Sequence, residues 1–149
     1  MNDLLFLAQR CPYPPNKGDK IATWNILQHL GRRYRIHLGT FIDDPHDWQH
    51  EGLLRETFAS VMLRPMTRST GLARAAHGLL SGAALSVAFY RDAPMQDWVN
   101  ARIHDGIRRV FVFSSANAVR KYTMRELVEL GVTWIWLGLE SPQAGYVKL

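Results

Sequence analysis

The stretch that decides the fold has three pieces: LLFLA at Leu4–Ala8, RCPYPPNKGDK at Arg10–Lys20 and IATWNILQHL at Ile21–Leu30. The first piece is an unbroken apolar run, which is typical of a buried strand. The last piece has the spacing of an amphipathic helix. The prolines between them hold the chain extended, because each fixes φ and disfavours helix in the residue before it. The sequence therefore predicts a strand, a loop and a helix in succession.

The end of that loop contains the first candidates for a binding site, namely Lys17, Gly18, Asp19 and Lys20. Gly18 lets the backbone approach a ligand closely, since it has no Cβ. The first N–H groups of the following helix have no partner inside the helix and favour an anion or a phosphate. Lys20 adds positive charge. The alternative is a simple loop glycine followed by a solvated Asp–Lys pair, and Asp19 also suits the N-cap position of the helix.

The rest of the chain alternates between predicted strands and predicted helices. Further strands are expected at Arg35–Phe41, Ala59–Leu63, Arg109–Phe113 and Val132–Leu139, and helices at Lys20–Arg33, Trp48–Phe58, Ser69 or Thr70 to Leu80, Asp92–Asp105 and Thr123–Leu130. Such alternation predicts a parallel sheet with helices on both faces. With right-handed crossovers, the expected fold is a single α/β domain, a Rossmann-like doubly wound parallel sheet with strand order 3-2-1-4-5.

Capping residues support several of these boundaries. Asp47 is expected to cap the helix that begins at Trp48, and Asp92, with Pro94 in the first turn, the helix that follows it. Thr123–Glu126 has the form of a capping box, and Gly131 suits the position just after the end of that helix.

Composition bounds the function classes. The chain has 149 residues, 47% of them hydrophobic and 21% charged, which suits one globular domain. Its one cysteine excludes an internal disulfide and a cysteine-based metal cluster. The net charge of +5 could attract anionic lipid or nucleotide sugars, and the alternative is a solvated surface with a mild basic excess. Nucleic acid is not expected as a partner, because the arginines are scattered. With no signal peptide or spanning segment, we expect a cytoplasmic protein, with peripheral attachment at the inner membrane as the alternative.

Cofactor and catalytic motifs are absent from the sequence. There is no G-x-G-x-x-G fingerprint for a nicotinamide and no G-x-S-x-G elbow for a serine nucleophile. His46 and His50 are four residues apart but have only aspartates nearby, so no metal site is expected. Ser114 and Ser115 follow a predicted strand, where their hydroxyls could bind an acceptor or a phosphate. Helix capping is the alternative role for these serines.

Four pieces of the chain together resemble a known family. They are Arg10–Lys20, Phe41–Asp47, Leu79–Asp92 and Val110–Ala116, and the resemblance covers residues 3–118. In this order they are similar to the N-terminal domain of retaining glycosyltransferases of the GT-B fold. The closer similarity is to sugar transferases associated with bacterial exopolysaccharide and PEP-CTERM sorting systems.

The resemblance implies half of a GT-B enzyme, its acceptor-side domain. Such an enzyme moves a sugar from a nucleotide sugar to a glycan or lipid-linked acceptor. The loop at 17–20 would face the donor diphosphate, and Asp43, Asp44, Ser114 and Ser115 would lie on the acceptor side. The donor-binding domain has no counterpart here, so we expect a separate donor domain as a partner, lost or weak nucleotide-sugar binding and no activity in isolation. The alternative is a non-catalytic remnant or interaction module.

The end of the chain differs from that family. Residues 125–149 resemble an internal helix and strand of a cobalamin-binding radical SAM protein. An active enzyme of that class is excluded, because its three-cysteine cluster motif is missing. We therefore divide the chain into a glycosyltransferase-like part, 1–118, and a tail of different origin, 119–149, which is expected to complete the same sheet. A natural fusion, a split enzyme and a truncated product all remain open.

Overall fold

The protein is a five-stranded parallel sheet with helices. The computed structural model describes residues 2–66, 92–114, 123–129 and 132–137. Its strands are β1 (Asn2–Ala8), β2 (Tyr34–Ile42), β3 (Ser60–Pro65), β4 (Val110–Ser114) and β5 (Val132–Leu137). The strand order is β3-β2-β1-β4-β5, and every pair is parallel. This confirms the predicted Rossmann-like α/β class and the predicted order, including the strand in the tail.

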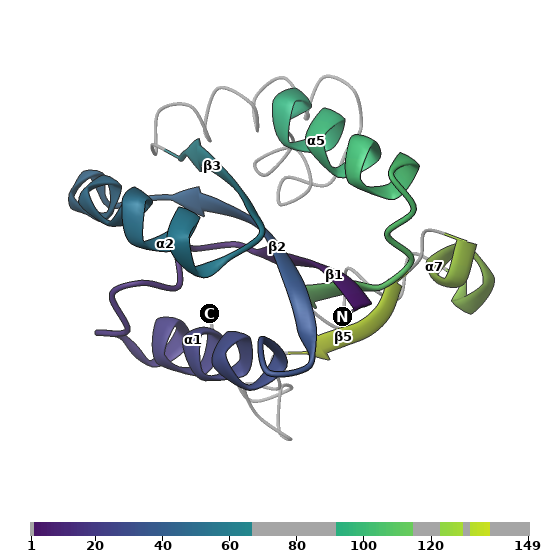
Figure 1. Ribbon diagram of the computed structural model, residues 1–149, viewed down its shortest axis with the longest axis horizontal. Coiled ribbons are helices and arrows are strands. Elements are labelled where there is room, and N and C mark those ends of the chain that lie inside the picture. The colour runs from purple at the N-terminus through teal and green to yellow at the C-terminus, as the bar shows by residue number, and fades with distance from the viewer. Residues whose placement is uncertain (1, 67–91, 115–122, 130–131, 138–149) are drawn as a thin grey trace, which may run out of the picture.

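The described helices are α1 (Gly18–Leu30), α2 (Glu51–Thr57), α5 (Ala93–His104), α7 (Met124–Glu129) and the short 3₁₀ helix η1 (Pro45–His50). Figure 1 shows α1 and α5 on opposite sides of the sheet. The chain thus covers one face on the way from β1 to β2 and the other before β4, as a doubly wound sheet requires. The helix expected at 69–80, the residues Ser115 and Gly131, and the last two residues of the strand expected at 132–139 lie outside the described residues. Within the described ranges, no helix is long and apolar enough to cross a membrane.

The structure corrects one capping assignment and confirms another. Asp44, not Asp47, is the cap: it accepts a hydrogen bond from the His46 N–H at 3.0 Å, and η1 begins at Pro45. The physical reason is that Pro45 already has the φ that the first helical position requires. The predicted cap on α5 is confirmed, since Asp92 accepts from the Met95 N–H at 3.0 Å.

The main core lies between the sheet and helices α1 and α2. Leu4 and Phe6 of β1 are fully buried there, together with Leu27 of α1 and Leu54 of α2. Phe6 also stacks on Phe111 of β4, with ring centroids 4.7 Å apart. Because β1 is central, its alternate residues pack on opposite faces of the sheet, so almost its whole length is apolar.

On the other face, α5 packs unusually close to the sheet at Gly39 of β2. A Cβ built on Gly39 would lie 2.8 Å from Leu7 Cδ2, 3.0 Å from Met95 Sδ and 3.1 Å from Trp98 Cζ3. These approaches are tighter than normal van der Waals contact. Gly39 therefore sets the distance at which α5 rests on β1 and β2.

This close packing gives a stability prediction. Gly39→Ala should lower the free energy of unfolding by about 1–3 kcal/mol, because the added methyl group overpacks the contact with α5. The matched control is Gly52→Ala in α2, where a Cβ meets nothing within 4 Å. There, alanine should leave stability unchanged or raise it by up to about 1 kcal/mol through its helix propensity. Urea unfolding measures both, and equal effects of the two changes would contradict this account.

An ion pair joins the first two strands near their amino ends. Arg35 Nε donates to Asp3 Oδ1 at 2.6 Å, and Arg35 Nη2 donates to Oδ2 at 3.2 Å. Asp3 is the second residue of β1 and lies directly opposite Arg35 on β2. The hydrogen bonds from Arg35 and then His37 lower the pKa of Asp3 from 3.8 to about 2.

The lowered pKa predicts how stability depends on pH. A carboxyl group whose pKa falls on folding stabilises the folded state above its unfolded pKa. The Asp3 contribution should therefore be complete above about pH 4 and should disappear as the pH falls from there to about 2. Asp3→Asn should flatten the urea midpoint against pH in that window, while Asp97→Asn, at an exposed site, serves as the control. An unchanged acid dependence in the Asp3 variant would contradict the assignment.

Candidate functional site

The loop between β1 and α1 is fastened onto the carboxyl end of the sheet. The Cys11 N–H donates to the Phe41 carbonyl at 2.8 Å, which ties the loop to the end of β2. The Cys11 thiol is buried and donates to the Tyr13 carbonyl at 3.2 Å. Burial raises the pKa of this thiol, so it stays protonated near neutral pH. Cys11 is thus an anchor of the loop.

Aromatic contacts fix the middle of the same loop. The Tyr13 ring meets Trp24 of α1 edge-on at 5.0 Å between centroids, and His50 at the end of η1 at 4.9 Å. Such edge-to-face pairs are each worth about 0.5–1.5 kcal/mol beyond the area they bury. The loop is therefore held between α1 and η1, and its last residues have a defined place above the sheet.

The predicted phosphate loop leads directly into α1. The helix begins at Gly18, with Lys17 as an extended N-cap residue that makes no side-chain capping bond. Asp19 is therefore not the N-cap, as one interpretation of the sequence had it, but a residue of the first helical turn. A Cβ at Gly18 would meet nothing within 4 Å, so the space in front of this glycine is open.

Arg10 joins two of the predicted site residues. Its Nε donates to Asp43 Oδ2 at 2.9 Å, its Nη2 also contacts that oxygen, and its Nη1 donates to Asp19 Oδ2 at 3.1 Å. The hydrogen bond to Asp43 comes first among the causes that raise the pKa of Arg10 well above its usual range. The guanidinium thus links the end of β2 to the start of α1, and its charge is matched by carboxylates.

Asp19 lies where a bound anion would be expected. Burial acts to raise the pKa of Asp19, but the hydrogen bond and charge of Arg10, together with the N–H groups of Asp19 and Lys20, hold it below its usual value. The carboxylate thus already interacts with the main-chain donors of the first turn of α1. A phosphate entering this position has to compete with it.

Lys20 has a different environment from the one that the sequence suggested. Its Nζ donates to Asp47 Oδ2 at 2.6 Å, and the two side chains are only 2% and 5% exposed. The ammonium is therefore directed into the protein and joins α1 to η1. A contribution of Lys20 to ligand binding stays a prediction, since the described contact is with Asp47.

The remaining predicted site residues are spread along the same edge of the sheet. Asp44 accepts from the His46 N–H and from its ring, and these bonds hold the pKa of Asp44 below its usual range. Ser114 is the last residue of β4. Ser115 lies outside the described part of the chain. Within that part, no group of three or more histidine, cysteine or acidic side chains could hold a metal ion.

A cavity of about 640 Å³ lies on the α5 side of this edge. Leu7 and Ala8 of β1 and Phe41 of β2 line it, with Gln96 and Asp97 of α5 as polar groups. Open α/β sheets bind ligands at the carboxyl ends of their strands, at the point where the crossovers change from one face of the sheet to the other. That point lies between β1 and β4 here. The cavity and the β1–α1 loop, which ends at Gly18 and is called the Gly18 loop below, flank it.

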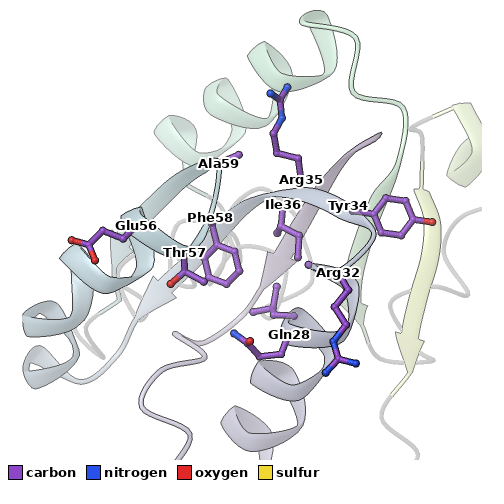
Figure 2. A pocket seen from close by; sticks show the side chains of 11 residues that line it. Gln28, Arg32, Tyr34, Arg35, Ile36, Glu56, Thr57, Phe58 and Ala59 are labelled. Carbon is purple, nitrogen blue, oxygen red and sulfur yellow. The ribbon is translucent and has the colours of Figure 1, made fainter. Parts of the chain in front are cut away.

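A second cavity, of about 530 Å³, lies at the opposite, amino end of the strands (Figure 2). Ile36 and Phe58 point into it, and Gln28 and Thr57 stand at its rim. It is formed where α1 and α2 both end, so helix carbonyl groups gather around it. No sequence pattern indicates this cavity, because its lining comes from two separate connections, one from α1 to β2 and one from α2 to β3.

Comparisons with protein-family models, with curated proteins and with solved structures gave no match to this chain.

The buried ion pair gives a prediction for this part of the protein. Lys20→Met should destabilise the fold by about 3–5 kcal/mol, because Asp47 is left buried without a charged partner. The double variant Lys20→Met/Asp47→Leu should regain most of that loss. Lys17→Met, at an exposed position, is the matched control and should change stability by less than about 0.5 kcal/mol. A single Lys20 variant as stable as the control would show that the pair is solvated in solution.

Proposed function

We propose that these 149 residues form the acceptor-side lobe of a GT-B sugar transferase, which works with a nucleotide-sugar donor on a glycan or lipid-linked acceptor. The observation that carries the proposal is the β1–α1 loop. It is fastened to the carboxyl end of the sheet beside the central strand, and it ends at Gly18 with open space in front. The fold class is compatible with this proposal but does not distinguish it from others, because doubly wound sheets have many functions.

Each part of the edge has a role in this proposal. The N–H groups at the start of α1 and the exposed Lys17 face the donor diphosphate. The cavity beside Phe41 and Gln96 gives room for an acceptor. The nucleotide would be held by a donor-binding lobe from outside these residues, whose closure excludes water from the reacting groups. Arg10 and Lys20 act as positioning residues that hold the loop.

A specific observation favours the alternative, a non-catalytic interaction module. Arg10 is paired with Asp19 and Asp43, and Lys20 with Asp47. Two of the cations near the loop are therefore neutralised within the protein. If Asp19 also keeps the first turn of α1 closed to anions, the loop serves only to position η1 and α1.

Pyrophosphate binding distinguishes the two functions. If the loop faces a diphosphate, pyrophosphate should shift the amide signals of Lys17–Ile21 in an NMR titration, with a dissociation constant near 1 mM, or about −4 kcal/mol. Gly18→Val should abolish these shifts by filling the open space, and Lys17→Ala should weaken binding. Asp19→Asn should strengthen binding several-fold, because the competing carboxylate charge is removed.

The controls separate a specific site from a basic surface. Arg32→Ala removes an exposed charge near the other end of α1 and should leave binding unchanged. Sulfate at equal ionic strength reports simple anion binding, and a nucleoside diphosphate reports any added contribution of the nucleoside. Pyrophosphate shifts confined to scattered arginines, with the loop amides unmoved, would leave the interaction module as the function.

A further inference from the structure

Three polar side chains form a hydrogen-bonded chain on the sheet, far from the Gly18 loop. Ser60 Oγ lies 2.8 Å from His37 Nδ1, and His37 Nε2 lies 3.1 Å from Asp3 Oδ1. The three residues come from three adjacent strands, β3, β2 and β1. Ser60 stands directly opposite His37 in the strand register. No local sequence pattern predicts this hydrogen-bonded cluster, since each residue comes from a different strand.

The charges around the imidazole determine which nitrogen carries the proton. Arg35 keeps Asp3 ionised, because its hydrogen bonds are the largest cause, ahead of the bond from His37, of the lowering of the pKa of that carboxyl to about 2. An ionised carboxylate only accepts hydrogen bonds, so His37 Nε2 must carry the proton. In the neutral ring, Nδ1 then has a lone pair directed at Ser60 and accepts its hydroxyl proton.

This is the arrangement of an activated nucleophile: a hydroxyl, a base within hydrogen-bond reach and a third group that orients the base. The ring is used in the opposite sense to the familiar serine triad, with Nδ1 rather than Nε2 facing the hydroxyl. The imidazole is buried, with its side chain 10% exposed, whereas Ser60 is half-buried. The base is thus held within the protein, and the hydroxyl beside it stays accessible.

The location separates this cluster from the proposed sugar-transferase site. Asp3 and Ser60 lie near the amino ends of β1 and β3, and the Gly18 loop lies at the carboxyl ends. Figure 2 shows Arg35 directed away from the cavity into which Ile36 and Phe58 point. Arg35 and its partner Asp3 therefore lie on the α5 side of the sheet, together with His37 and Ser60.

We propose that Ser60 is a nucleophile, activated by His37 and Asp3, that reacts with esters carrying a good leaving group. Ser60 Oγ attacks the carbonyl carbon, and its proton passes to His37 Nδ1. The C–O bond to the leaving group breaks, and that oxygen takes the proton from His37. Water, deprotonated by the same nitrogen, then attacks the acyl carbonyl carbon; its bond to Ser60 Oγ breaks, His37 returns the proton to that oxygen, and the carboxylic acid leaves. Good leaving groups are specified because they depend least on further stabilisation of the oxyanion.

A fluorophosphonate probe tests the nucleophile directly on the 149-residue protein. The Ser60 oxygen forms a bond to phosphorus, the P–F bond breaks and fluoride leaves, while His37 takes the proton. We expect a single labelled site at Ser60 by peptide mass spectrometry. Labelling should become faster as the pH rises, because a protonated imidazole cannot act as a base. Protein unfolded in urea should not be labelled.

Variants separate activation from mere exposure of a hydroxyl. Ser60→Ala should abolish labelling, and His37→Gln should slow it by at least 100-fold, the low end of the contribution of a general base. Thr57→Ala removes an exposed hydroxyl that donates to the Leu53 carbonyl, outside the cluster, and should change nothing. The pH profile of the unaltered protein needs no folded variant. No label on Ser60, or a labelling rate independent of pH and of His37, would overturn the proposal.

Discussion

The central position of β1 is the constraint on which the rest of the structure depends. Its residues Leu4, Leu5 and Phe6 are fully buried, and both edges of the strand are paired in parallel, to β2 and to β4. Parallel strands can be joined only by a crossover connection, which is usually a helix, so the parallel strands on each side of β1 require one. Right-handed crossovers to its two sides then place α1 and α5 on opposite faces. The helices on the two faces of the sheet therefore diverge at the carboxyl end of β1, and the loop that follows β1 lies at this point.

Most of the fold could be predicted from local sequence patterns. Apolar runs such as Leu4–Ala8 and Val110–Phe113 are short and buried on both faces, so their strand character is visible without tertiary information. Asp92 followed by Pro94 gave the start of α5 correctly, because a cap and a proline at the first turn act locally. The same reasoning failed at Asp47. Pro45 lies between Asp44 and Asp47 in the sequence and starts the helix early, so Asp44 becomes the cap, while Asp47 pairs with Lys20 of another helix.

The candidate site was less accessible to sequence reasoning than the fold. Lys17 to Lys20 were correctly placed where the first loop meets the first helix, although the helix already begins at Gly18. A sequence does not show which charges meet. Arg10 reaches Asp43 across 33 positions and Lys20 reaches Asp47 across 27. These long-range pairs turn an apparently basic loop into one whose charges are largely balanced. In the proposed function, anion binding therefore depends on main-chain N–H groups and Lys17, rather than on the number of lysines and arginines.

The anchoring of Cys11 has a consequence for measuring the motions of this protein. The chain has a single thiol, that of Cys11, which is fully buried, and the main-chain N–H of the same residue fastens the loop to β2. A thiol reagent reaches it only when the loop lifts from the sheet or the whole domain unfolds. The rate of modification relative to a free thiol therefore reports the free energy of that opening. The unaltered protein therefore contains its own probe of the opening of the region beside its candidate site.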